Sequence, residues 1–205
     1  MLKAYGYSVS GNCWKVRQVL ELTNTPFTWV EVDSNAGETR TPAYLAKNPN
    51  GKVPMVELDD GQIITESNAI LLHFAEGTAL LQPAGLALTR VLEWLFFEQY
   101  SHEPAIAVAR NWISYRKIRK EKLGELNAIW ENGYKALAVM ERRLGAHRWL
   151  AGDRMSVADL ALFAYTQCAE EGEFDLGPYT GVEAWRQRMI ASPGIRPLAK
   201  AHVTK

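Results

Sequence analysis

The sequence contains few cysteines and no excess of charge of either sign, and both features limit the kinds of protein it can encode. Two cysteines, Cys13 and Cys168, occur among 205 residues, which suits reduced thiols better than a disulfide framework. Lysine plus arginine and aspartate plus glutamate are equal at 23 each, so overall charge predicts no nucleic-acid partner. The four histidines show no ligand spacing, and we expect no metal site.

Long apolar runs are also missing. Each uninterrupted run is only a few residues, too short to cross a membrane, and the first residues show no signal-peptide pattern. We therefore expect a cytoplasmic protein with no membrane partner. The length suits one large domain or two small ones.

The stretch 48–74 carries the densest local signals. It opens with the turn cluster Asn48–Gly51. Two short apolar runs on either side of Asp60-Gly61 predict a β-hairpin. The polar residues Thr65–Asn68 then precede the apolar run 69–74, which predicts the start of a helix.

Two features of this stretch indicate a binding role. Glu66 and Ser67 stand where a helix begins, and the unpaired N–H groups and dipole at that point favour an anion. Val53 precedes Pro54, and its backbone groups are available to pair with an extended peptide. The same residues also suit a plain helix cap and a shaped loop, so both interpretations stay open.

The first part of the chain alternates between strand and helix patterns. We expect a strand at 2–7, a helix from Cys13, a second strand at 27–32 and a short helix at 41–45. With the hairpin and its following helix, this order predicts a small α/β domain of the thioredoxin-like kind over residues 1–78.

Residues 79–86 lose periodicity and predict a linker, and residues 87–205 predict an all-helical domain. The first expected helix, 88–100, is apolar nearly all round. This indicates burial on several sides, against a core and a second subunit. Further helices are expected over 105–118 (after a break at Pro104), 121–144, 160–165 and 185–190.

Three motifs, in this order, carry a family resemblance. They are Ser10–Cys13 at the first helix, Lys52-Val53-Pro54 with Glu66-Ser67, and a capping box from Ser156 to Asp159. Over essentially its whole length the chain resembles a cytosolic glutathione transferase, most closely the bacterial, serine-using members similar to the theta, delta and zeta classes. The resemblance implies a thioredoxin-like α/β N-terminal domain followed by an all-α C-terminal domain.

The resemblance also implies a glutathione site, with glutathione as co-substrate and no metal. Its γ-glutamyl end would meet Glu66 and Ser67, and its cysteinyl backbone would pair with Val53, presented by a cis-Pro54. Its glycyl carboxylate would lie near Lys52.

The resemblance further implies that the thiol is activated beside the first helix. Ser10 is the first candidate for the group that stabilises the thiolate, and Cys13, Asn12 and Tyr7 are its rivals. A small hydrophobic electrophile would bind along the first long helix of the second domain. The candidates for that pocket, each also compatible with packing or surface exposure, are Tyr100, His102, Arg110, Trp112 and Tyr115.

The expected function is therefore a cytoplasmic, homodimeric glutathione transferase that detoxifies small electrophiles. The basic run 116–120 is interpreted as a solvated helix end rather than a nucleic-acid site. The alternatives are a glutathione-dependent isomerase of the zeta kind, a disulfide reductase on the same fold, and a non-catalytic ligand-binding protein.

Overall fold

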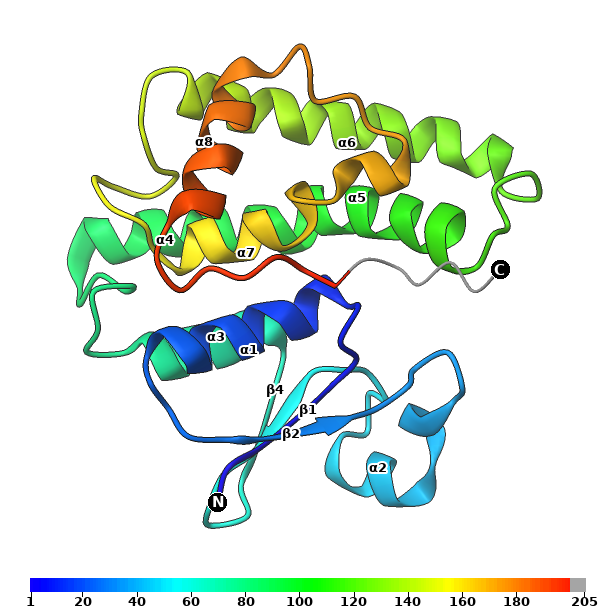
Figure 1. Cartoon of the computed structure of the whole chain (residues 1–205), viewed down its shortest axis with the longest axis vertical. Helices are drawn as coiled ribbons and strands as arrows, with labels where there is room; N and C mark the ends of the chain where they lie inside the picture. The colour runs from blue at the N-terminus through cyan, green and yellow to red at the C-terminus, as the bar shows by residue number, and fades with distance from the viewer. Residues whose placement is uncertain (200–205) are drawn as a thin grey trace.

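The computed structural model describes residues 1–199 and divides into a sheet half and a helical half (Figure 1). The sheet half has four strands in the order β2-β1-β3-β4, with β1 and β2 parallel and the other pairs antiparallel. Its elements are β1 (Lys3–Gly6), α1 (Gly11–Leu22), β2 (Thr28–Glu31), η1 (Glu38–Arg40), α2 (Pro42–Lys47), β3 (Met55–Glu57), β4 (Ile63–Thr65) and α3 (Ser67–Ala75).

The two faces of the sheet pack against different helices. Val56 is buried in the main core with residues of α1 and α3, whereas its neighbour Met55 packs in a smaller cluster with Tyr44 of α2. Successive strand residues point to opposite faces, which explains why two adjacent apolar residues serve two cores. Figure 1 shows α1 and α3 between the sheet and the helical half.

The helical half is built around α7. It contains α4 (Gly85–Phe97), η2 (Glu98–His102), α5 (Glu103–Arg110), η3 (Asn111–Tyr115), α6 (Leu123–Leu144), α7 (Val157–Thr166), η4 (Ala169–Gly172) and α8 (Thr180–Ala191). Every residue of α7 is buried. The expected break at Pro104 takes the form of the π-helical turn η2, after which proline occupies the first turn of α5, where its missing N–H costs little.

The predicted capping box at the start of α7 is confirmed. The Ser156 hydroxyl and the Asp159 carboxylate satisfy each other's backbone N–H groups. The fully buried Asp159 also accepts hydrogen bonds from the Leu150 N–H at 3.1 Å and the Trp185 indole N–H at 3.0 Å. One carboxylate thus ties together the start of α7, the preceding loop and α8.

Two features of the start of the helical half bear on the predictions. Helix α4 begins at Gly85, within the stretch 79–86 predicted as linker, and the domain boundaries stay predictions. Helix α4 packs against the core of its own chain, whereas its burial against a second subunit stays a prediction. Val91 and Leu95 are buried, but Phe96 is 73% and Tyr100 89% exposed.

The two halves share one continuous apolar core. Side chains of α1, α3, α4 and α7 belong to the same buried cluster, and the rings of Trp14 and Phe163 lie 5.5 Å apart across the boundary. No helix within residues 1–199 is both long and apolar enough to cross a membrane.

Candidate functional site

A cavity of about 450 Å³ lies where α1, the loop before β3, and α3 meet the first helices of the other half. Polar side chains form most of its wall. Five of the sequence-predicted residues line it together: Lys52, Val53, Pro54, Glu66 and Ser67. Asn12, a rival candidate for the thiol contact, also lines it, whereas Ser10 does not.

The start of α3 presents unpaired N–H groups to this cavity. Among the described residues no side chain caps the helix, and its first internal bond runs from the Ile70 N–H to the Glu66 carbonyl. The preceding amides at the helix start therefore have no partner within the helix, and the helix dipole adds to their attraction for an anion. Glu66 itself has a φ of 65°, a left-handed conformation that is unfavourable outside glycine and common at binding sites.

The loop before β3 is held open for backbone pairing. The Val53–Pro54 peptide bond is cis. The Lys52 carbonyl accepts hydrogen bonds from the Tyr44 hydroxyl and the Asn48 amide, each at 2.8 Å. Within residues 1–199, neither the N–H nor the carbonyl of Val53 has a hydrogen-bond partner, so both can meet an extended peptide.

Asn12 lies at the first turn of α1, between residues from both halves. Its amide oxygen accepts a hydrogen bond from the Ser67 hydroxyl, and its NH₂ group donates to the Glu103 carboxylate, both at 3.3 Å. Burial is the main reason that the pKa of Glu103 is raised above its usual value. The polar end of Asn12 is therefore positioned by the residues around it.

Ser10 serves as the N-cap of α1. Its hydroxyl accepts the Cys13 N–H at 3.4 Å, which satisfies one of the free amides at the helix start. The ring of Tyr165, from α7, covers the next residue so closely that a Cβ on Gly11 would come within 2.7 Å of it. Ser10 therefore caps α1 and does not line the cavity.

The other two rivals differ in their surroundings. Cys13 is fully buried, its sulfur accepts the Tyr7 N–H at 3.2 Å, and burial raises the pKa of the thiol to about 11. Such a thiol stays protonated near neutral pH and is inert. Tyr7 is half-buried and does not line the cavity.

Two of the electrophile candidates contact the loop that leads into α1. The Val9 carbonyl accepts hydrogen bonds from the Arg110 guanidinium and the Tyr115 hydroxyl, each at 2.9 Å. Arg110 is buried and also pairs with Glu171 at 2.8 Å. These contacts hold the loop against the helical half.

The other three electrophile candidates are dispersed. Tyr100 is exposed and lines a different cavity, and the half-buried Trp112 ring packs under the Lys122 ammonium at 5.1 Å. His102 is fully buried, with its Nε2 2.9 Å from the Thr166 hydroxyl. The structure does not bring these three together, and their roles stay predictions.

The protonation state of His102 follows from its partner. The Thr166 hydroxyl donates its hydrogen to the Leu162 carbonyl at 2.8 Å, so it must accept from His102 Nε2. The other ring nitrogen, Nδ1, is buried without a partner among the described residues. Burial lowers the pKa of His102 to about 4, so the ring is neutral.

Two family models match the chain. One describes the N-terminal domain of glutathione S-transferase and matches residues 9–76, and the other describes its C-terminal domain and matches residues 111–193. A solved glutathione S-transferase of Xanthobacter autotrophicus Py2 is 52% identical, covers 98% of each chain and has a TM-score of 0.95. The chain belongs to the glutathione S-transferase family. The family and the two-part fold predicted from the sequence are thereby confirmed.

Other members of the glutathione S-transferase family differ in identity and named activity. A probable glutathione S-transferase of Oryza sativa subsp. japonica is 32% identical over 97% of this chain and 95% of the relative. A maleylacetoacetate isomerase of Pseudomonas aeruginosa is 27% identical (95% and 94% covered), and a disulfide-bond oxidoreductase of Escherichia coli is 26% identical (91% and 89%). The family is therefore established, but it includes more than one reaction.

One structural relative within the family carries the expected ligand. A family member from Pseudomonas fluorescens Pf-5, with two glutathione molecules bound, is 23% identical, covers 94% of this chain and 89% of that one, and has a TM-score of 0.82. At this identity, the similarity between that structure and this chain shows only that the two share a fold. No group of three or more His, Cys, Asp or Glu within residues 1–199 is arranged to hold a metal ion.

Several cavity residues were not predicted from the sequence. Gln99, Glu103 and Asn111 reach the cavity from the helical half, and Ser34, Thr39, Arg40, Asn48 and Asn50 from the sheet half. Glu103 follows Gln99 by four residues, and Asn111 follows Glu103 by eight. This spacing puts the three polar groups on one helix face. The polar spacing could be seen in the sequence, but in a single sequence it looks the same as the solvent-exposed face of a helix.

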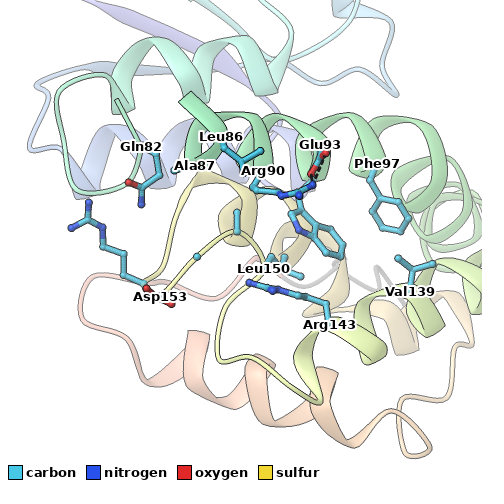
Figure 2. Close-up of a pocket in the computed structure, with 14 residues that line it drawn as sticks. Gln82, Leu86, Ala87, Arg90, Glu93, Phe97, Val139, Arg143, Leu150 and Asp153 are labelled. Carbon is cyan, nitrogen blue, oxygen red and sulfur yellow. Dashed lines mark hydrogen bonds and ion pairs between the residues drawn. The ribbon is translucent and has the colours of Figure 1, made fainter. Parts of the chain in front are cut away.

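A second cavity of this family member, of about 1090 Å³, lies elsewhere (Figure 2). It separates α4 from α6, and Figure 2 shows Arg143 across from Arg90 and Glu93. It is lined by Trp94 and Phe97, which belong to the helix expected to contact a second subunit, and by none of the predicted glutathione residues.

Proposed function

We propose that this chain is a glutathione transferase that binds glutathione in the 450 Å³ cavity and activates its thiol for attack on small hydrophobic electrophiles. The observation that carries the proposal is the convergence of three features on that cavity. They are the free backbone of Val53, the unpaired amides at the start of α3, and the side chain of Asn12.

The charges around the cavity match those of a γ-glutamyl tripeptide. The α-carboxylate of its glutamyl residue would bind the backbone amides at the start of α3. Its ammonium group would lie between the carboxylates of Glu66 and Glu103. The glycyl carboxylate would approach Lys52 and Arg40. These assignments agree with the chemistry of the lining residues.

With both ends held this way, the cysteinyl residue pairs with Val53 and its thiol is directed toward the first turn of α1. A free thiol has a pKa of about 8.5, so little of it is thiolate at neutral pH. Lowering that pKa by about two units needs roughly 2.7 kcal/mol of preferential stabilisation of the thiolate. One charge-assisted hydrogen bond of about 1.5–3 kcal/mol, with the helix dipole, supplies it.

We assign that hydrogen bond to Asn12 rather than to Ser10. The Asn12 amide lines the cavity, and its NH₂ group has two hydrogens, of which Glu103 takes one. Ser10 has its hydroxyl at the helix cap. The thiolate formed beside Asn12 then attacks an electrophilic carbon and displaces its leaving group.

The assignment predicts different effects for two alanine variants. In Asn12→Ala, the pKa of bound glutathione should rise by about one unit or more, because a hydrogen bond to a charged group is lost. In Ser10→Ala, that pKa should stay unchanged, while loss of the cap costs about 1 kcal/mol of stability. Thiolate absorbance of the bound ligand, measured against pH, separates the two. A rise in Ser10→Ala alone would return the role to Ser10.

A second function is favoured by the named relatives. An isomerase and an oxidoreductase align along most of the chain, and both could use the same activated glutathione. Cys13 and Cys168 are both buried, and neither lines the cavity. The two cysteines therefore do not support a reductase of the two-cysteine kind. Assays with glutathione and aryl halides, enones and mixed disulfides would distinguish these reactions. The cytoplasmic location stays a prediction, as does the exclusion of a purely ligand-binding protein.

We propose a homodimer, with the apolar side of α4 as part of the contact. Phe96 is 73% exposed, and Trp94 and Phe97 line the large cavity beside it. A second copy would cover these rings, which otherwise stay in water. The mass in solution should therefore be twice the 23.0 kDa of one chain, and a mass of one chain at micromolar concentration would contradict the dimer.

A further inference from the structure

A buried ion pair lies directly behind the cavity. Lys15 of α1 and Glu98 of η2 are both fully buried, and their charged atoms are 2.8 Å apart. The Lys15 ammonium also donates to the Asn68 amide oxygen at 3.2 Å and to the Ser67 hydroxyl at 3.4 Å. All three of its hydrogens are therefore used, and one of them reaches a residue of the cavity wall.

The other half of the ion pair is equally well satisfied. One Glu98 oxygen pairs with Lys15, and the second accepts hydrogen bonds from the amides of Asn68 at 3.0 Å and Gln99 at 2.7 Å. Asn68 donates its remaining hydrogen to the Leu95 carbonyl at 3.1 Å. The position of the Lys15 ammonium is thus fixed by groups from both halves of the chain.

The direction of the hydrogen bonds follows from the chemistry of the donors. An ammonium group can only donate, so Ser67 accepts from Lys15 and uses its own hydrogen elsewhere. That hydrogen goes to Asn12, which must present its amide oxygen to Ser67. The NH₂ group of Asn12 then faces the other way, toward Glu103 and the cavity.

We propose that Lys15 is a positioning residue: acting through Ser67, it orients the Asn12 amide so that an N–H, not the carbonyl oxygen, faces the thiol of the ligand. This inference rests on the proposed function. Without the ammonium, the Ser67 oxygen is free to accept a hydrogen bond from the Asn12 NH₂ group. The amide then has only Glu103 to fix its orientation, and rotation by half a turn would turn its oxygen, which repels a thiolate, toward the ligand.

The effect of Lys15 is carried by these hydrogen bonds rather than by its charge. The ammonium lies against the Glu98 carboxylate, so the pair has no net charge to act on the sulfur over a distance. Stability alone gives a weak reason for the pair, because a well-packed apolar replacement of a buried ion pair is often neutral or stabilising. A role in orienting Asn12 gives the pair a function at the site.

The test uses the double variant Lys15→Met/Glu98→Gln, which removes both charges together. Thiolate absorbance of bound glutathione against pH should show the thiol pKa raised by about one unit, a ten-fold smaller ratio of thiolate to thiol at a given pH. The matched control is Lys135→Met/Glu131→Gln, an exposed ion pair on α6 that should leave the thiol pKa unchanged.

A second background shows whether Lys15 acts through Asn12. When Asn12→Ala is already present, adding Lys15→Met/Glu98→Gln should not raise the thiol pKa further. An equal rise in both backgrounds would overturn the inference, because the ion pair would then act without Asn12. No rise in the wild-type background would overturn it as well.

These outcomes are separate from failure of the proposed function. If wild-type protein does not bind glutathione, or Asn12→Ala leaves the thiol pKa unchanged, the proposed function fails and this inference with it. If Asn12→Ala raises the pKa but the double variant does not, only the role of Lys15 is lost. Should the double variant not fold, Lys15→Met/Glu98→Met makes the same prediction with an apolar pair.

Discussion

Replacing Lys15 alone by methionine should lower the free energy of unfolding by about 3–5 kcal/mol, measured by urea denaturation. The change leaves the Glu98 carboxylate fully buried without its cation, although Asn68 and Gln99 still donate to it. An uncompensated buried charge is among the most destabilising results of a single substitution.

Two further variants show that the uncompensated charge is the cause. Adding Glu98→Gln to Lys15→Met should recover most of the loss, because the carboxylate is neutralised while an amide oxygen remains for Asn68 and Gln99. Lys135→Met removes the lysine of an exposed pair, with both side chains more than 60% accessible, and should cause no measurable change. If the single and double variants at the buried pair are equally unstable, the loss comes from packing and this explanation is wrong.

Stability should also fall as the pH is lowered from about 6.5 to 4, because of His102. The unfolded chain gains a proton on this ring near pH 6.5, whereas the folded pKa is about 4. Above pH 6.5 neither state is protonated, and between the two values only the unfolded state binds the proton. The shift corresponds to a loss of about 3 kcal/mol when the pH has fallen to 4.

The contribution of His102 is isolated by comparing variants over this range. Glutamine at position 102 retains a donor for Thr166 but does not titrate, so His102→Gln should flatten the fall in stability. The charged groups that face His102, Glu98 and Lys15, and the buried Glu103 are the same in both proteins. The exposed His147→Gln serves as the control and should keep the full pH dependence. An unchanged slope in His102→Gln would show that another group is responsible.

Local patterns predicted much of the fold correctly. The hairpin at Asp60-Gly61 and the capping box from Ser156 to Asp159 depend on residues a few positions apart. Such signals need no knowledge of the rest of the chain. The order of elements then led to the thioredoxin-like half and its helical partner, which the family comparison confirms.

The parts that could not be predicted depend on long-range contacts. Lys15 stands among polar positions of an amphipathic helix, and nothing near it in sequence shows that Glu98 meets it 83 residues later. The exposure of Phe96 likewise depends on which side of α4 the core occupies. For the thiol contact, the family resemblance favoured Ser10. In the structure Ser10 caps α1 and Asn12 lines the cavity, and which of the two contacts the thiol stays a prediction.

The glutathione site itself is tested most directly by calorimetric titration of glutathione into the wild-type protein and Glu66→Ala. We predict saturable binding with one glutathione per chain, and affinity at least about ten-fold weaker in Glu66→Ala, which loses a charged partner of the ligand ammonium. Glu131→Ala, on the exposed face of α6, should bind like the wild type. No binding by the wild-type protein, or equal affinity in Glu66→Ala, would contradict the site proposed at the start of α3.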